Sequence, residues 1–407
     1  MPAVARGHAE SAARRNALVL AMAQAVVGSA APVAISIGGL AGYWLLLSDK
    51  SFATLPVTGY NLGVALGAIP AAILMRKVGR RHGFVAGSLV VSMGALCAAL
   101  ALFQSNFWLF ASALLMIGIG GSFTQQYRFA AADGAPRAYQ PRAIGIVLAG
   151  GIFAAVIGPQ AVRFTDRLFF PVEFAGAFFA LAILGLIGAA VLSFLRVPPV
   201  SAEAAAEDAV PQRALGQIVR QPRFLVGLLC GVGTFATMSF VMTGAPLAMV
   251  GCGLSRDVSV LGIQWHVLAM FGPSFFTGRL IARFGKTRIV ATGMLLLAAS
   301  AAVSLSGLEL WNFWTGLVLL GFGWNFGFIG STAMVAETYR PSERNKTQGL
   351  HDMVLFGCVA AASLMSGRVY IAAGWETMNL VVFPVVALCL AALALQAWSG
   401  PRLAAEG

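Results

Sequence analysis

Charged residues and long polar stretches are scarce in this chain of 407 residues. Only 10% of the residues are charged, against roughly 25% in ordinary soluble domains. The charges stand in short clusters between apolar runs of about 20 residues or more, which is the length that crosses a bilayer. This scarcity excludes a sizeable soluble domain. Together with the 59% of hydrophobic residues, it predicts an all-α polytopic membrane protein whose first partner is the lipid bilayer.

Sequence motifs for enzymatic chemistry are also missing. The chain has no Gly-x4-Gly-Lys-Ser/Thr loop for a nucleotide, no His-Glu-x2-His zinc motif and no Ser/His/Asp arrangement. No Asp or Glu stands clearly in the middle of an apolar run, so a proton relay built on carboxylates has no obvious carrier. We therefore expect neither an enzyme nor an ATP-driven pump, and we expect no cofactor.

The cysteines are few and scattered. The five are Cys97, Cys230, Cys252, Cys358 and Cys389, and no two of them form a Cys-x2-Cys pair. Most lie in apolar runs, which is typical of small core residues and not of a disulfide framework. Only Cys252 stands near the predicted outer face of the membrane.

The net charge of +12 has a membrane explanation that does not require nucleic acid. Most of the 27 Lys and Arg residues fall at the termini or in alternate loops, which is the positive-inside signature. This distribution predicts that both termini are cytoplasmic. The exceptions, expected on the opposite side, are Lys50, Arg163, Arg167, Arg256 and Arg368.

The apolar runs predict twelve membrane segments. A polar stretch with several prolines and acidic residues, 197–222, is predicted to be a cytoplasmic linker with a short amphipathic helix near Leu215 to Val219. The linker divides the chain into an N-terminal six-helix bundle, 1–196, and a C-terminal six-helix bundle, 223–407. The twelve segments are 16–46, 53–75, 83–104, 107–130, 143–164, 173–195, 223–249, 257–281, 288–306, 313–337, 347–371 and 376–398.

The two halves repeat each other in short matches that fall in the same order. Parallel repeats of this kind place a substrate site near the midplane, at the interface between the halves. The matched pairs are Ala31-Pro32 with Ala245-Pro246, the basic run 76–80 with 282–286, and Tyr127-Arg128 with Tyr339-Arg340.

This six-plus-six plan resembles the major facilitator superfamily over nearly the whole chain. The run Gly79-Arg80-Arg81 matches the family's Gly-Arg-Arg motif after the second segment. Arg76 stands where the family usually carries an acidic residue, so the gating ion pair built on that acid is not expected here. The resemblance implies two pseudo-symmetric six-helix bundles and secondary transport by alternating access.

Soft side chains stand close together in the seventh and eighth segments. Met238 and Met242 are four residues apart, as are His266 and Met270, so each pair lies on one helix face about 6 Å apart along the axis. Thioether and imidazole ligands suit Cu(I). The residues also have an ordinary interpretation, because methionine fills irregular cores and a buried histidine can hydrogen-bond a backbone carbonyl or Gln264.

These four residues, with the surrounding Gly244-Ala245-Pro246 and the run 264–275, look like the paired motifs of the CcoA-like transporters. That resemblance implies import of copper across the bacterial inner membrane, supplying cbb3-type cytochrome oxidase through a cytoplasmic copper acceptor. By the same resemblance, the copper ion is bound by Met238, Met242, His266 and Met270. The accessory candidates are Cys230, Cys252 and His351. His351 is a candidate either for an exit station or for an interfacial pair with Asp352.

Two other functions remain open at this point. The CcoA-like branch includes riboflavin importers, and a riboflavin or similar planar solute would be bound by aromatic and amide side chains. The residues suggested for such a site are Trp265, Gln264, Tyr60 and Gln24. A non-transporting assembly or sensor subunit is the third hypothesis, and the short loops argue against it.

Overall fold

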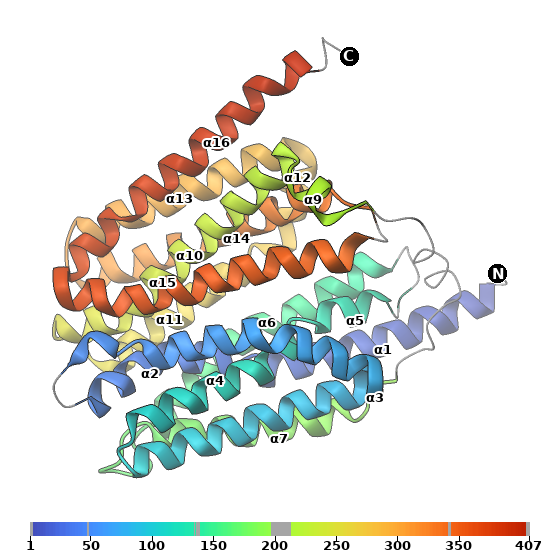
Figure 1. Ribbon diagram of the computed structural model, residues 1–407. Helices are drawn as coiled ribbons and strands as arrows, with labels where there is room; N and C mark the ends of the chain where they lie inside the picture. Colours follow the sequence, from blue (N-terminus) through green and yellow to red (C-terminus); the bar gives the residue numbers. More distant parts are fainter. Residues whose placement is uncertain are drawn as a thin grey trace.

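The computed structural model describes residues 3–46, 49–133, 135, 139–196, 213–340 and 343–403, and the secondary structure within these ranges is helical. The part of the chain before the linker forms a first group of helices that pack against one another (Figure 1). The first group consists of α1 (Ala3–Val27), α2 (Ala30–Leu45), the short 3-10 helix η1 (Lys50–Phe52), α3 (Leu55–Phe103), α4 (Phe107–Thr124), α5 (Tyr127–Asp133), α6 (Gln140–Thr165) and α7 (Ala175–Leu192).

The part of the chain after the linker forms a second group, which lies beside the first in Figure 1. A five-residue helix begins it at Leu215, where the sequence predicts a short helix. The second group consists of α9 (Leu215–Val219), α10 (Pro222–Gly251), α11 (Arg256–Phe271), α12 (Ser274–Phe284), α13 (Lys286–Leu305), α14 (Leu310–Ala336), α15 (Arg344–Leu380) and α16 (Val382–Leu403).

Ten stretches of the described residues are long and apolar enough to span a membrane, if the bent pair α11 and α12 is taken as one span. Two of them, Lys50–Phe103 and Lys346–Trp398, have 54 and 53 residues, about twice what a hydrocarbon layer of roughly 30 Å requires. Figure 1 shows that both turn back on themselves, so each contains two of the predicted segments. The described residues therefore contain all twelve, and the predicted fold class is confirmed.

Glycines make the tight reversals between these segments. Gly79 turns α3 with φ 82° and ψ 157°, and Gly285 separates α12 from α13 with φ 84° and ψ 156°. Positive φ at these values is disfavoured for any residue with a side chain. The two glycines occupy matched positions in the basic runs 76–80 and 282–286, so the sequence repeat at this loop is also a repeat of backbone conformation.

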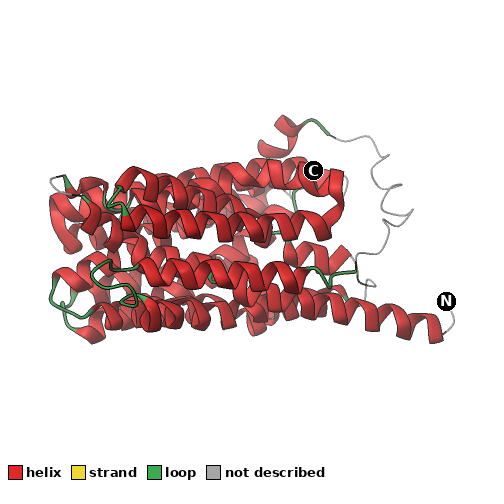
Figure 2. Cartoon of the chain, turned by 90° about the horizontal axis from the view of Figure 1, so that it is seen from below, coloured by secondary structure: helices red, strands yellow, loops and turns green. Residues whose placement is uncertain are grey.

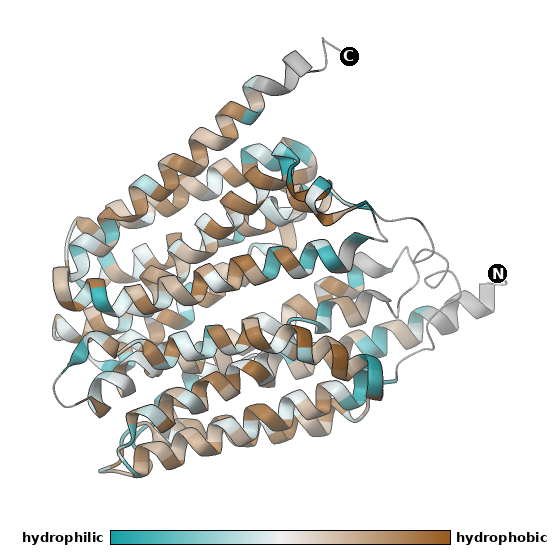
Figure 3. Ribbon diagram, viewed as in Figure 1, coloured by the Kyte–Doolittle hydropathy of each residue, from teal (hydrophilic) through white to brown (hydrophobic). Residues whose placement is uncertain are grey.

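The surface of the bundle is apolar along its length and polar at its ends. Figure 3 shows hydrophobic residues along the helices, and Figure 2 shows the connecting loops gathered at the two ends of the bundle. Large side chains such as Ile69 and Phe153 are about two-thirds exposed, at 65% and 63%. A soluble protein would rarely leave so much apolar surface uncovered, and lipid covers it here.

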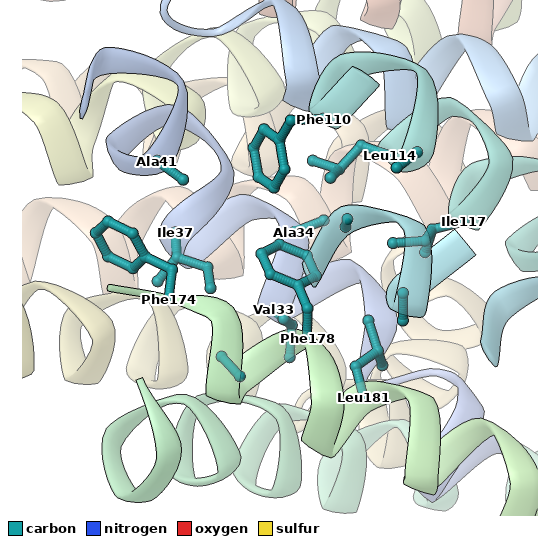
Figure 4. Close-up of a cluster of buried hydrophobic side chains, with 14 of the residues drawn as sticks. Val33, Ala34, Ile37, Ala41, Phe110, Leu114, Ile117, Phe174, Phe178 and Leu181 are labelled. Atoms are coloured by element: carbon teal, nitrogen blue, oxygen red, sulfur yellow. The ribbon is translucent and has the colours of Figure 1, made fainter. Parts of the chain in front are cut away.

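The first group has a tightly packed core of aromatic and aliphatic side chains from α2, α4 and α7 (Figure 4). Phe110 of α4 and Phe178 of α7 meet edge to face, with ring centroids 5.3 Å apart. Val33, Ala34 and Ile37 of α2 pack beside them. The small residues in α2 allow this close approach, which is the usual means of helix packing in a membrane.

Both termini lie on one side of the bundle, which also carries the Gly79 and Gly285 turns (Figure 1). We call it the terminal side, and we call the opposite side, which carries η1 and the loop 166–174, the far side. Among the described residues, polar contacts between the two groups lie toward the far side. Arg256 pairs with Glu173 at 2.8 Å, and the backbone N–H of Gly367 donates to Thr54 Oγ1 at 3.2 Å.

The end of the predicted linker is fixed to the second group on the terminal side. Residues 197–212 of the linker lie outside the described residues, and the described part begins at Arg213. Arg213 forms a two-pronged ion pair with the buried carboxylate of Glu343, with Nη2 to Oε2 at 2.6 Å and Nε to Oε1 at 2.9 Å. These hydrogen bonds hold the pKa of Glu343 far below its usual range, so the carboxylate stays charged at neutral pH.

Candidate functional site

The four residues predicted to bind metal lie inside the second group. Met238 and Met242 of α10 are 1% and 4% exposed, and His266 and Met270 of α11 are 0% and 7% exposed. The three methionines belong to one apolar cluster. The structure therefore places all four in the interior, as the helix spacing predicts, and their role as metal ligands stays a prediction.

His266 has one ring nitrogen already engaged. Nδ1 lies 2.7 Å from the carbonyl oxygen of Leu317 on α14, and a carbonyl can only accept, so Nδ1 carries the hydrogen. Nε2 has no hydrogen-bond partner among the described residues. The backbone contact matches the ordinary interpretation of this histidine, in which it ties α11 to α14.

The accessory candidates are spread over the second group. Cys230 is buried beside Cys389 of α16, with Sγ 3.9 Å from the Cys389 carbonyl oxygen. Cys252 is exposed at the other end of α10, about 33 Å from Cys230 at 1.5 Å per residue, so the structure does not bring these two cysteines together. Among the described residues, no three His, Cys, Asp or Glu side chains are placed to hold a metal ion.

An aromatic cluster, which the sequence analysis does not identify, lies in the middle of the second group. It consists of Phe235 (α10), Phe271 (α11), Trp324 and Phe328 (α14) and Phe356 (α15). The indole of Trp324 stacks on Phe328 with centroids 5.0 Å apart and planes tilted by 20°. Phe235 meets Trp324, Phe328 and Phe356 edge to face at 5.4, 5.2 and 5.7 Å, and Phe271 meets Trp324 at 6.0 Å.

The aromatic cluster lies at mid-membrane and borders the first group. Phe235 and Trp324 stand near the middle of their helices, and Phe271 ends α11 at the bend before α12. A Cβ added to Gly151 of α6 would lie 3.3 Å from Cδ1 of Phe271, and one added to Gly150 would lie 3.0 Å from Cβ of Gln24. The site therefore has aromatic walls from the second group, and one of its rings, Phe271, packs against a glycine of the first group.

Trp324 also offers a free hydrogen-bond donor in this cluster. Its side chain is largely buried, and Nε1 has no hydrogen-bond partner among the described residues. A buried indole N–H normally finds an acceptor. A planar solute with an acceptor at its edge would satisfy it.

The residues that the sequence suggests for binding an organic solute differ in exposure and lie in both groups of helices. Trp265 is 45% exposed. Gln264 accepts a hydrogen bond from Gln160 of α6 at 2.6 Å, which joins the two groups. Tyr60 is buried against Gly118 and Gly121 of α4 within the first group. Gln24 lies against Gly150, the neighbour of the glycine that Phe271 contacts.

The helix spacing in the sequence indicates one part of the aromatic cluster. Trp324 and Phe328 are four residues apart in the tenth segment, so they share a helix face just as Met238 and Met242 do. The rings from the other helices are isolated in the sequence. Only the folded structure shows that Phe235, Phe271 and Phe356 meet this pair.

The fold is typical of a membrane transporter, and comparison with known proteins identifies the family of the chain. The chain belongs to the Major Facilitator Superfamily, whose profile matches residues 16–273 and 267–404. This confirms the resemblance at the level of the superfamily, and confirms that the chain is a transporter and not an enzyme.

Two relatives cover almost the full chain. The chain is 48% identical to the riboflavin transporter RfnT of Brucella anthropi, over 95% of this chain and 96% of that protein. It is 30% identical to an uncharacterized transporter of the same superfamily, YddS of Bacillus subtilis, over 94% of this chain and 93% of that protein.

The predicted import of copper, with supply of cytochrome oxidase, is wrong. The relative that is 48% identical over 95% of this chain is a riboflavin transporter. The physical reason for the error is that spacing alone cannot separate a ligand from a packing residue. Met238 and Met242 point into an apolar core that methionine fills readily.

Proposed function

We propose that this protein is a secondary transporter that carries riboflavin, or a closely similar planar heteroaromatic solute, across a bacterial inner membrane. The observation that carries the proposal is the aromatic cluster around Trp324, which lies at mid-membrane and faces the first group. A flavin ring is flat, aromatic and edged with acceptors, so it can stack on these rings and satisfy the Trp324 N–H. The similarity to a riboflavin transporter supports this choice of cargo.

Transport follows alternating access in this proposal. Residues 1–196 and 223–407 move as two bodies around the central site, with 197–222 as the linker. The positive-inside pattern makes the terminal side, with both termini, cytoplasmic. In that orientation, the Glu173–Arg256 pair and the Thr54–Gly367 contact hold the two groups together on the periplasmic side. A reporter enzyme fused to either terminus should be found in the cytoplasm.

The resemblance to the CcoA-like group enters this proposal only through its branch of the superfamily, which also contains riboflavin importers. In this proposal copper is not the cargo, and a cytoplasmic copper acceptor is not among the partners.

The test is uptake of labelled riboflavin by proteoliposomes that contain the purified protein. Trp324→Ala removes the stacking surface, and loss of an aromatic platform for a planar base costs about 1–3 kcal/mol, so KM should rise roughly fivefold to a hundredfold. Trp311→Ala is the matched control, because that indole is exposed near the start of α14, 13 residues and about 20 Å along the helix axis from Trp324. Absence of riboflavin uptake by the wild-type protein would refute the proposal, as would equal effects of the two substitutions.

A further inference from the structure

Two polar atoms from different helices converge beside the aromatic cluster. Gly231 lies on α10 four residues before Phe235, about 6 Å toward the terminal side. A Cβ added to Gly231 would lie 3.2 Å from Ser331 Oγ of α14 and 3.6 Å from His351 Nε2 of α15. Gly231 therefore lets a hydroxyl and an imidazole come close to the backbone of α10, next to the proposed ring site, where any side chain would be in contact with both.

The imidazole of His351 presents an unused acceptor beside Gly231. Its side chain is buried, and Nδ1 lies 2.9 Å from Oδ1 of Asp352. The carboxylate can only accept, so Nδ1 of the neutral ring donates, and the lone pair remains on Nε2. Nε2 has no partner among the described residues. A buried acceptor without a donor is unfavourable, so a ligand that brings a donor would be bound.

The hydroxyl of Ser331 also has acceptor capacity left. Ser331 Oγ donates its hydrogen to the carbonyl of Phe328 at 3.0 Å, which leaves its lone pairs for another donor. Two acceptors beside a glycine match a chain of hydroxyl groups, since each hydroxyl carries a hydrogen to donate. A flavin ring has a single N–H at its edge, so two neighbouring acceptors are matched better by the hydroxyl-bearing chain.

We propose that Gly231, Ser331 and His351 form a second subsite, which binds the hydroxyl-bearing chain of the cargo. When the flavin ring stacks on the aromatic cluster, the ribityl chain of riboflavin extends toward the terminal side. His351 Nε2 and Ser331 Oγ accept hydrogen bonds from its hydroxyls, and Asp352 holds the imidazole in the required tautomer. This inference rests on the proposed function and adds a recognition site for the part of the cargo that is not aromatic.

The test compares two ligands that share the ring and differ in the chain. Binding of riboflavin and of lumiflavin, which carries a methyl group in place of the ribityl chain, is measured by quenching of flavin fluorescence with purified full-length protein. His351→Ala removes one acceptor, and Gly231→Ala places a methyl group against both acceptors. Each should weaken riboflavin binding about three- to tenfold, the cost of a lost hydrogen bond, and leave lumiflavin binding unchanged.

Gly357→Ala is the matched control, because a Cβ added there, also on a membrane helix, meets no atom within 4 Å. His351→Gln keeps an acceptor in the side chain and should recover part of the riboflavin affinity. The subsite is refuted if His351→Ala and Gly231→Ala weaken both ligands equally, or if neither changes riboflavin binding. If the wild-type protein binds neither flavin, the proposed function itself fails.

Discussion

Methionine in a membrane helix can serve as a soft ligand or as a flexible packing residue. Met242 is 4% exposed and belongs to the same apolar cluster as Met238 and Met270. Its helix spacing fits both roles, so the spacing alone does not decide between them. A change that removes the sulfur and keeps the volume separates the two roles.

We predict that Met238→Leu and Met242→Leu both retain riboflavin uptake. Exchanging Met for Leu in a core usually costs less than about 1.5 kcal/mol, so KM should stay within about twofold of the wild type and the protein should remain in the membrane. The measurement is uptake by cells, corrected for the amount of protein in the membrane fraction. Loss of uptake by a variant that is present at the normal level would show that the sulfur itself takes part.

At the scale of the element, the bend between α11 and α12 is what places Phe271 in the aromatic cluster. The two helices differ in direction by 42° at Gly272–Pro273, where the proline cannot donate a backbone hydrogen bond. Asn325, fully buried on α14 next to Trp324, donates to the Met270 carbonyl at 2.6 Å and to Ser274 Oγ at 2.8 Å. Its amide oxygen accepts from Thr277 at 2.6 Å.

We predict that Asn325→Ala lowers both thermal stability and cargo affinity. The substitution removes the Asn325 donor from the Met270 carbonyl and from Ser274 Oγ, at about 1–3 kcal/mol for each buried group left unpaired. Thr277 keeps its bond to the Pro273 carbonyl, and Phe271 is free to shift relative to Trp324. The melting temperature of the purified protein and the KM for riboflavin measure the two effects.

Asn379→Ala is the control, because this buried asparagine hydrogen-bonds, within the described part of the chain, only Trp375 O of its own helix. The control variant should lose stability without a change in KM. A similar KM for both variants would contradict the role of Asn325 in positioning the ring.

The sequence predicts the elements of this protein better than it predicts its site. The long apolar runs and the basic loops are sufficient for the twelve segments, because crossing a bilayer imposes length and hydrophobicity directly. The short helix at Leu215 and the shared conformation of Gly79 and Gly285 are also visible as local signals. The aromatic cluster is not, because its rings come from four separate helices and each looks like an ordinary membrane residue.

The polar contacts between the two groups of helices are not predicted from the sequence, for a related reason. Glu173 looks like a solvated helix end in the sequence, and in the structure it pairs with Arg256, a residue 83 positions away. The guanidinium of Arg256 also lies 5.0 Å from the centroid of the Phe174 ring. Such partners are fixed by the packing of the two groups, and no local pattern carries that information.

At the scale of the whole molecule, the far-side contacts must open in each transport cycle. Thr54 and Gly367 come from different groups, and a Cβ added to Gly367 would lie 3.2 Å from Cβ of Thr54. That is slightly less than the 3.8 Å that is typical of a disulfide. A pair of cysteines at these positions is therefore close enough to be linked by a small adjustment.

We predict that Thr54→Cys combined with Gly367→Cys forms a disulfide under mild oxidation and arrests riboflavin transport. Reduction should restore transport, because the linkage acts by holding the far side closed. Mass spectrometry of the cleaved protein identifies the linked peptides, and proteoliposome flux measures activity before and after reduction. Each single cysteine variant serves as a control, and full flux through the linked double variant would show that this contact does not open.

All five rings of the aromatic cluster belong to helices after residue 221. A flavin stacked on them would therefore stay bound to the second group while the first group moves relative to it. The stacking surface is not dismantled when the site changes the compartment it faces, so affinity for the ring is nearly the same in both orientations. In the proposed transporter, the direction of net movement would therefore have to come from something other than the stacking surface.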